Sequence, residues 1–261
     1  MTLRTPPFPS PLPPAPADAD DLAAITVAQW RAVPEAEPSA AAAWMEAAAQ
    51  LGHARAQAVL GQWRLDGHGG ERDAEQALHW FLRAAQLGDT MAMNMAGRCH
   101  EEGWGTPPDA SKAAHWYLQA ARQGLAPAQY NLANLLASGS GVARDLVQAH
   151  ALYQQAVDQG YAKACAKLGR FHEDGTVVPR DADVAFELYR RGAEGGDFRG
   201  MFCYAGMLAA RNRKAEALDW LAKVPQTATQ RYLRMAGELL LQSPDADFRA
   251  LGASMLERAK K

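Results

Sequence analysis

A self-similarity with a period of 36 residues constrains the fold of this chain more than any other feature of its sequence. Four blocks follow one another without a gap, at residues 53–88, 89–124, 125–160 and 161–196. A loop glycine, an aspartate and an aromatic residue recur at fixed places in each block: Gly67, Gly103, Gly139 and Gly175, then Asp73, Asp109, Asp145 and Asp181, then Phe81, Tyr117, Tyr153 and Tyr189. Such a period is typical of repeat arrays, whose units pack mainly on their neighbours.

Each block has the pattern of a helical hairpin. Small residues such as Ala56 recur at helical spacing and let the two helices approach closely. The loop glycine is expected to end the first helix, because a positive φ costs glycine nothing. The aspartates are predicted N-caps of the second helix, where Gln76 and Gln148 could complete a capping box. Lys112 and Val184 stand at that place in the other two blocks and predict weaker caps.

Degenerate units flank the four blocks. Trp44 lies 36 residues before Trp80, which predicts a capping unit with one helix over 21–33 and a second capped by Ser39. In the unit that follows the fourth block, the loop between the two helices is four residues shorter, so Asn212 is expected to cap a shortened hairpin. Two further helices are predicted near 228–242 and 244–260, the second capped by Ser243 and begun by Pro244. The predicted organisation is a disordered Pro-rich leader at 1–18, a capping unit at 19–52, four repeats at 53–196, a shortened repeat at 197–225 and capping helices at 226–261.

The strings ALHWFLRAAQLG and AAHWYLQAARQG, each preceded by a glycine loop and an aspartate, resemble Sel1-like repeats, the longer-looped relatives of tetratricopeptide repeats. The resemblance covers residues 40–196 and, more weakly, 197–225. It implies an all-α fold, a right-handed α-solenoid of some twelve helices, and a non-enzymatic role as a protein-binding scaffold or adaptor. Two departures from the repeat are visible: Val177 stands where a second loop glycine is usual, and His100 and His172 replace a tyrosine at the end of the first helix.

Composition restricts the class of protein. The net charge of −2 gives no general attraction to nucleic acid or to an anionic membrane. No apolar run is long enough to cross a membrane, and the Pro-rich start lacks the regions of a secretory signal. Cys99, Cys165 and Cys203 fall at different repeat positions, which favours small buried residues over disulfides or reactive thiols. These features predict a cytoplasmic chain, expected to be a monomer.

Two His-acid strings, HEEG at 100–103 and HEDG at 172–175, could supply metal ligands or an acid–base pair. Successive residues on a helix point in different directions, so polar residues at a helix end are the favoured interpretation. GHGG at 67–70 lacks the strand and the Lys-Ser/Thr of a phosphate-binding loop. His79 and His115 share a repeat position that should face solvent. The sequence therefore predicts no catalytic residue, no metal site and no cofactor.

A binding surface has better support. The resemblance implies that the first helices line a concave face, on which the third, sixth, tenth and thirteenth residues of each block should be exposed. The candidate peptide-binding residues at these places are Arg55, Met91, Asn94, Arg98, Tyr130, Asn134, Lys163 and Arg170, together with Gln62, Arg199 and Phe202. Amides, cations and aromatic rings of this kind could hold an extended protein or peptide segment.

The sharpest form of this hypothesis is a ladder. Arg98, Asn134 and Arg170 occupy the tenth position of three successive blocks and should offer hydrogen-bond donors to an acidic or C-terminal peptide. Ordinary solvated helix residues are the alternative interpretation of the same set. Two other functions stay open: an enzyme-like relative that binds cell wall or β-lactam, which in this family looks secreted and rich in cysteine pairs, and a binder of single-stranded nucleic acid that uses the cations of the groove.

Overall fold

The computed structural model describes residues 12–260, and in this range the chain is all-α. About 73% of the chain is helical, and no strand occurs in the described part. Fifteen α-helices follow one another there, rather than the twelve or so expected from the sequence. Their bounds are α1 Ala19–Ala24, α2 Val27–Ala32, α3 Pro38–Gln50, α4 Ala54–Asp66, α5 Ala74–Gln86, α6 Thr90–Glu102, α7 Ala110–Arg122, α8 Ala126–Ser138, α9 Leu146–Asp158, α10 Ala162–Asp174, α11 Ala182–Glu194, α12 Phe198–Ala210, α13 Lys214–Lys223, α14 Gln230–Leu241 and α15 Ala246–Arg258, with short 3₁₀ turns at Val33–Glu35 and Val224–Gln226.

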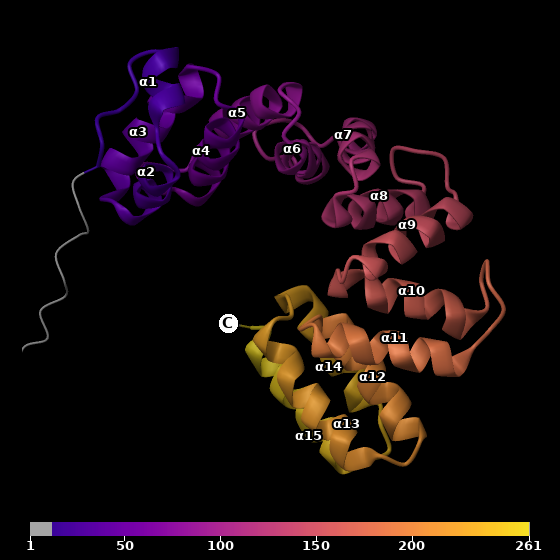
Figure 1. Cartoon of the computed structure of the whole chain (residues 1–261). Helices are drawn as coiled ribbons and strands as arrows, with labels where there is room; N and C mark the ends of the chain where they lie inside the picture. The colour runs from indigo at the N-terminus through magenta and orange to yellow at the C-terminus, as the bar shows by residue number, and fades with distance from the viewer. Residues whose placement is uncertain (1–11, 261) are drawn as a thin grey trace, which may run out of the picture. The chain divides into compact units, whose positions relative to one another are not determined.

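The helices form consecutive hairpins in two compact units (Figure 1). The N-terminal unit runs to Ala128 and also holds Ser138–Arg144, and the C-terminal unit consists of Gln129–Ala137 and the chain from Asp145 onward. In the first unit α4 packs on α5 and α6 on α7, and in the second unit α10 packs on α11, α12 on α13 and α14 on α15. This pairing of sequential helices confirms the α-solenoid of 36-residue hairpins.

The helix ends follow the repeated residues. Gly67, Gly103 and Gly175 cap the first helices at positive φ values of 77°, 76° and 71°. The repeated aspartates accept hydrogen bonds from the backbone amides three residues later, at 2.9–3.0 Å in all four repeats. The four caps have the same geometry, so the weaker caps predicted for the repeats with Lys112 and Val184 are not visible in these distances.

Close packing of the hairpins depends on a small residue opposite each aromatic ring. Gly97 lies so near the buried Tyr117 ring that a Cβ there would be 2.6 Å from two ring carbons. Gly169 faces Tyr189 in the same way, with a Cβ-to-ring distance of 2.7 Å. A larger side chain would force the ring or the helix to move, which explains why these helix-interior positions hold glycine in spite of its low helix propensity.

The second loop glycine of a repeat allows a different close approach. A Cβ at Gly105 would lie 2.2 Å from the carbonyl oxygen of Ala74, at the start of the preceding second helix. Gly69 and Gly141 contact the preceding second helix in the same manner, both at positive φ. Val177 occupies this place in the fourth repeat and keeps the left-handed conformation, with φ of 72°. A β-branched residue is strained there.

The N-terminal cap differs from the sequence-based prediction in two details. The helix predicted over 21–33 is broken into α1 and α2, because Thr26 and Gln29 form a capping box that starts a new helix. The cap of α3 is Glu37, whose carboxylate accepts from the amide of Ala40, so the assignment of this role to Ser39 is wrong.

Part of the Pro-rich segment also packs on this cap. The indole Nε1 of Trp44 donates to the carbonyl of Pro14 at 3.2 Å, and Leu12 contacts the same apolar cluster. The prediction of a disordered leader to residue 18 did not anticipate these contacts, and its first eleven residues lie outside the described range.

The C-terminal predictions need two similar corrections. Asn212 does not cap α13 but stands at φ of 59° after α12, in the left-handed conformation that glycines adopt after the first helices of the other hairpins. Arg213 precedes α13 with no side-chain cap. The cap of α15 is Asp245, which accepts from the amide of Asp247, so the expectation for Ser243 and Pro244 is displaced by one to two residues.

Candidate functional site

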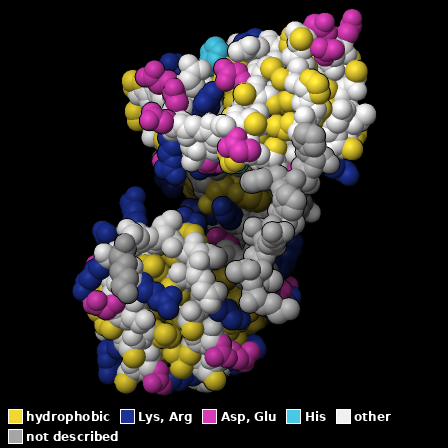
Figure 2. All heavy atoms as spheres, turned by 90° about the vertical axis from the view of Figure 1, so that its left-hand side faces the viewer, with side chains coloured by type: hydrophobic (Ala, Val, Ile, Leu, Met, Phe, Trp, Pro, Cys, Tyr) yellow, Lys and Arg dark blue, Asp and Glu magenta, His cyan; other side chains and the backbone are white. Residues whose placement is uncertain are grey.

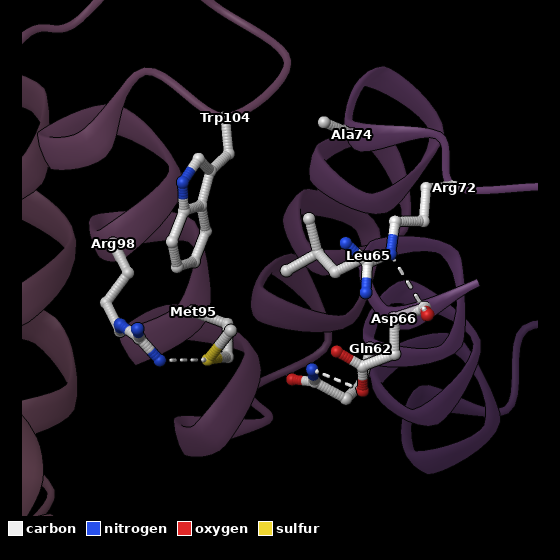
Figure 3. Close-up of a pocket in the computed structure, with 8 residues that line it drawn as sticks. All are labelled: Gln62, Leu65, Asp66, Arg72, Ala74, Met95, Arg98 and Trp104. Carbon is white, nitrogen blue, oxygen red and sulfur yellow. Dashed lines mark hydrogen bonds between the residues drawn. The ribbon is translucent and has the colours of Figure 1, made fainter. Parts of the chain in front are cut away.

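A pocket of about 600 Å³ lies between α4 and α6, the first helices of two successive repeats in the N-terminal unit (Figure 3). Its polar side chains come from both helices and from the loop before α5, and its apolar side chains include Leu65, Met95 and Trp104. The residues that line it are Gln62, Leu65, Asp66, Arg72, Ala74, Met95, Arg98 and Trp104. Gln62 and Arg98 are both tenth residues of their repeats, which is the place where the sequence predicts a binding surface.

Arg98 is the central cation of this pocket. Its guanidinium lies over the Trp104 indole, 4.8 Å from the ring centroid, and one of its nitrogens is 3.8 Å from the Met95 sulfur. Figure 3 shows these three side chains together on the α6 wall. None of the ion pairs in the described part of the chain involves Arg98. The side chain is therefore held by stacking, and most of its N–H donors are left for a ligand.

The opposite wall supplies the other charges. The Gln62 amide donates to the Asp66 carboxylate at 2.9 Å, and the Nε of Arg72 donates to the backbone carbonyl of Asp66 at 3.2 Å. The described lining thus holds two cations and one carboxylate that already has a partner. A positive pocket with Leu65 and Trp104 as apolar walls suits a carboxylate flanked by an aliphatic side chain.

Of the eight lining residues, the sequence predicted only Gln62 and Arg98. Among the other six, Trp104 and Arg72 could not be placed because both lie in loops. Trp104 folds back over α6 because it stands between Gly103 and Gly105, both at positive φ, and its amide donates to the Cys99 carbonyl at 2.9 Å. Arg72 immediately precedes the cap Asp73. A bulky aromatic residue between the two loop glycines was the available signal in the string GWGTPP.

The predicted surface residues are not equally exposed. Arg55, Met91, Lys163 and Arg170 are exposed, as expected. Asn94 and Tyr130, both sixth residues, are only 4% and 8% exposed, so their assignment to an open surface is wrong. The Tyr130 ring packs on Tyr153 of its own repeat, with ring centroids 5.9 Å apart, and on Tyr161 at the start of the next repeat, at 5.5 Å.

The predicted ladder is divided between the two units. Arg98 belongs to the N-terminal unit, and Asn134 and Arg170 belong to the C-terminal unit. Asn134 is half-buried and accepts the Tyr153 hydroxyl at 2.7 Å, so this side chain has a packing role that the sequence did not indicate. Arg170 forms an ion pair with Asp174 at 2.8 Å. Peptide binding by the three residues stays a prediction.

The His-acid strings have structural contacts of their own. Glu101 accepts the hydroxyl of Tyr117 at 2.6 Å, and Glu173 accepts that of Tyr189 at the same distance. His100 is 7% exposed, and burial lowers its pKa. No group of three or more His, Cys, Asp or Glu in residues 12–260 is arranged to hold a metal.

The other histidines and the cysteines considered for chemistry are likewise surface or packing residues. His79 and His115 are exposed and stand edge-on to the neighbouring tryptophans. All three cysteines are free, and burial raises the pKa of the Cys99 and Cys203 thiols to about 11. At neutral pH these two thiols are protonated and poor nucleophiles.

Comparison with known proteins agrees with this architecture. The sequence profile of the Sel1 repeat matches residues 33–53, 54–89, 90–125, 126–161 and 162–197. The chain belongs to the Sel1 repeat family. The first match lies on the N-terminal cap, and the others follow the four hairpins from α4–α5 to α10–α11. Sel1 repeat solenoids generally mediate protein–protein interactions and typically serve as non-catalytic scaffolds.

Solved structures with the same fold come from several bacteria. A Sel1 repeat protein from Oxalobacter formigenes is 26% identical with a TM-score of 0.73, and the match covers 86% of this chain and 92% of that one. The protective antigen c5321 of uropathogenic Escherichia coli is 25% identical with a TM-score of 0.66, over 85% of this chain and 49% of the antigen. The immunity protein PA5088 from Pseudomonas aeruginosa, at 15% identity and a TM-score of 0.55 over 79% and 81%, shares the fold alone.

Comparison with curated proteins gives no match. None of the helices in residues 12–260 has the length and apolar character needed to cross a membrane.

Proposed function

We propose that this Sel1 repeat protein is a non-catalytic scaffold that binds a partner protein through a carboxylate-bearing segment, with the carboxylate against Arg98 in the pocket between α4 and α6. The observation that carries the proposal is the Arg98 guanidinium, which is stacked on Trp104 and has no carboxylate partner in the described chain. A guanidinium held over a ring loses little entropy on binding and can present paired N–H groups to both oxygens of a carboxylate.

The apolar walls add to this recognition. Leu65, Met95 and the Trp104 ring border the pocket on the sides that Arg98 and Arg72 leave open (Figure 3). A ligand that carries an aliphatic side chain next to its carboxylate would bury that side chain against them, at about 25 cal/mol for each Å² removed from water. Both an acidic side chain and a free C-terminus have this chemistry.

The proposed binding surface continues along the first helices through the other exposed candidates. In the N-terminal unit Arg55 and Met91 lie at the exposed starts of α4 and α6, and in the C-terminal unit Lys163 and Arg170 lie on α10. We propose that this face is concave in each unit and suits an extended segment, as the family resemblance implies. Three free cysteines fit a reducing compartment such as the cytoplasm, and we propose a monomeric chain there.

The proposal is tested with three synthetic peptides that differ only in their carboxylates. Acetyl-Leu-Glu-Leu-amide carries a side-chain carboxylate, acetyl-Leu-Gln-Leu with a free end carries a terminal one, and acetyl-Leu-Gln-Leu-amide carries none. We expect one of the first two to bind in calorimetric titrations and to shift the Trp104 indole N–H signal in NMR spectra, assigned with Trp104→Phe. Equal binding of the neutral peptide would contradict the proposal.

Protein variants locate the contact. Arg98→Met keeps the length and apolar stem of the side chain and should weaken binding by roughly ten- to a hundredfold, since a charge-assisted hydrogen bond contributes about 1.5–3 kcal/mol. Arg122→Met, on the exposed face of α7, is the matched control and should bind like the parent protein. Unchanged binding by Arg98→Met would place the site elsewhere.

The ladder is tested with a longer acidic peptide. If the segment reaches both units, Arg98→Ala combined with Arg170→Ala should weaken binding of that peptide more than Arg98→Ala alone, while the thermal unfolding midpoint stays nearly the same. No additional loss in the double variant would confine recognition to the N-terminal unit.

A further inference from the structure

A second pocket, of about 520 Å³, lies at the N-terminal cap. It is formed by α2, the 3₁₀ turn that follows, α3 and the start of α4, all within the N-terminal unit. Figure 2 shows hydrophobic side chains gathered on the surface of its upper body, which is this unit. The volume is in the range of ligand-binding sites. The apolar part of the lining consists of Val27, Trp30, Pro34, Met45, Ala56 and Val59.

The polar side chains that line this pocket, which we call the cap pocket, are all hydrogen-bond donors. Arg31 on α2 and Arg55 on α4 are exposed, and neither takes part in an ion pair within the described chain. The Nδ1 of His53 accepts the amide of Ala56 at 3.1 Å, so the neutral ring carries its proton on Nε2. Burial lowers the pKa of His53 from 6.5, which keeps the ring neutral at physiological pH. Trp30 adds an indole N–H.

The lining holds no anion that could balance these donors. No carboxylate, amide or hydroxyl side chain is among the described residues that border the cap pocket. Two acids stand next to lining residues in the sequence. Glu46 is paired with Arg64 at 2.9 Å, and Glu35 does not border the pocket. The arrangement therefore suits an anion that is joined to an apolar group.

The aromatic wall of the cap pocket is held in place by its neighbours. The Trp30 ring stacks on His53 with ring centroids 4.3 Å apart, and it meets the Trp44 ring edge-on at 4.9 Å. Trp44 and Met45 are buried in the apolar cluster of the cap, on which Trp30 packs. A ligand that packs on a wall fixed in this way does not have to order it first, which lowers the entropic cost of binding.

We propose that the cap pocket binds the free C-terminal residue of a partner protein, with the carboxylate at Arg31 and Arg55 and a bulky apolar side chain against Trp30 and Met45. A C-terminal residue carries both groups on one Cα. In an internal acidic segment, successive side chains point in different directions on a strand or a helix, so an apolar neighbour does not enter the pocket together with the acid. The site is separate from the Arg98 pocket.

The rim of the cap pocket favours a chain end over a free small molecule. Val27 is 67% exposed, and both arginines of the lining are exposed as well. The opening is therefore broad, and the residue that precedes the terminal one can pack on Val27. Sites for small molecules, in contrast, bury most of the surface of their ligand.

The probe is the peptide acetyl-Gly-Ser-Gly-Phe with a free C-terminus, titrated into the isotope-labelled full-length protein. We expect saturable binding that shifts the Trp30 indole N–H signal in NMR spectra, assigned with Trp30→Phe. Three matched peptides each remove one feature: the first ends in an amide, the second has alanine in place of phenylalanine, and the third is acetyl-Gly-Phe-Glu-Gly-amide, which carries the ring and the carboxylate on neighbouring residues. Each should bind at least about tenfold more weakly than the probe.

Val27→Glu is the decisive variant, because it changes the rim without disturbing a buried residue. The new carboxylate stands at the first position of α2 and four residues before Arg31, where the helix dipole and an ion pair both favour it. The thermal midpoint should therefore not fall, whereas probe binding should weaken at least about tenfold, since the carboxylate competes for Arg31. Val147→Glu is the matched control, because Val147 is also 67% exposed, near the start of α9, and does not line the pocket.

Arginine variants separate this site from the pocket between α4 and α6. Arg31→Met and Arg55→Met should each weaken probe binding, as read from the Trp30 signal, and should leave the thermal midpoint unchanged because both side chains are exposed. Arg98→Met should leave the response of Trp30 intact.

Four results would overturn the proposal. Undiminished probe binding by a folded Val27→Glu variant would show that the cap pocket is not used. Equal binding of the amide or the alanine peptide would show that the carboxylate or the apolar side chain is not recognised. Equal binding of acetyl-Gly-Phe-Glu-Gly-amide would assign the pocket to an internal acidic segment, and binding of N-acetyl-phenylalanine as tight as that of the probe would assign it to a small molecule.

Discussion

The hydrogen bond between Tyr117 and Glu101 allows a quantitative test of how these repeats are held together. Tyr117 is completely buried, and its hydroxyl donates to the half-exposed Glu101 carboxylate at 2.6 Å. Burial, and next the hydrogen bond to Glu101, raise the pKa of Tyr117, so the hydroxyl remains a donor throughout the physiological range. In the first repeat the equivalent residues are Phe81 and Leu65, whose side chains have no polar atoms.

The two single changes should differ in cost. Glu101→Leu leaves the Tyr117 hydroxyl buried with no acceptor, and an unsatisfied buried donor costs about 1–3 kcal/mol. Tyr117→Phe removes the donor and leaves a carboxylate that water can reach, so its cost should be nearer to about 1 kcal/mol. Combining them recreates the apolar pair of the first repeat. The double variant should therefore be more stable than the sum of the single changes predicts, by a coupling energy of about 1–2 kcal/mol.

Urea unfolding of the four proteins, followed by far-ultraviolet circular dichroism, measures this coupling. The equivalent cycle at Tyr189 and Glu173 is a replicate in the C-terminal unit, because its hydrogen bond has the same length. Comparing the cycles guards against a change in unfolding cooperativity, to which repeat arrays are prone. A coupling energy below about 0.5 kcal/mol in both cycles would refute the reasoning, since the hydroxyl would then find water or another acceptor.

Two further stability predictions follow from the backbone and from buried histidines. Val177→Gly should stabilise the chain by roughly 1 kcal/mol, because glycine removes the strain at a φ of 72°. Gly105→Val should destabilise it by roughly 2–4 kcal/mol, because the added side chain would collide with the backbone at Ala74. Thermal melts measure both changes, and midpoints equal to that of the parent protein would contradict this account. Burial lowers the pKa values of His53, His100 and His150 from 6.5, so the unfolded chain binds more protons than the folded chain below about that pH. The urea concentration at the unfolding midpoint should therefore decrease when the pH is lowered from about 7.5 to about 5.5. Replacing His100 with Gln should reduce this fall, and an unchanged midpoint in the parent protein would exclude the linkage.

The repeat scaffold could be predicted from the sequence because its determinants are local and repeated. Three kinds of residue determine each hairpin: a glycine that ends the first helix, an aspartate that caps the second, and a small residue that faces an aromatic ring. Each of them makes its contacts within one hairpin and recurs in all four repeats. The caps were predicted less well because they occur once. Glu37 rather than Ser39 caps α3, and the capping box between Thr26 and Gln29 divides the single helix predicted over 21–33 into two.

The candidate site was predictable only in part, because the sequence does not show which helix positions are covered by neighbouring side chains or how loop residues are oriented. Repeat position identified Arg98 and Gln62 as pocket residues, since both tenth positions face the space between first helices. It failed for Asn94 and Tyr130, because both side chains are buried, and Tyr130 packs on Tyr153 of its own repeat and on Tyr161 of the next. Trp104 and Arg72 could not be placed by helical periodicity, since loop residues have no fixed phase relative to the helices.

One repeat position lines both the pocket between α4 and α6 and an apolar groove between α12 and α14. The tenth residue is Gln62, Arg98, Asn134, Arg170 and Gly206 in five successive units, which are five different side chains on one backbone geometry. Where it is Arg98, the space beside it is a cationic pocket, and where it is Gly206, the space is an apolar groove. Asn134 shows the limit of this freedom, because its bond to Tyr153 makes it part of the packing. A constant hairpin with a variable tenth residue can therefore change its ligands one repeat at a time, while the glycines, aspartates and aromatic rings that maintain the fold are left untouched.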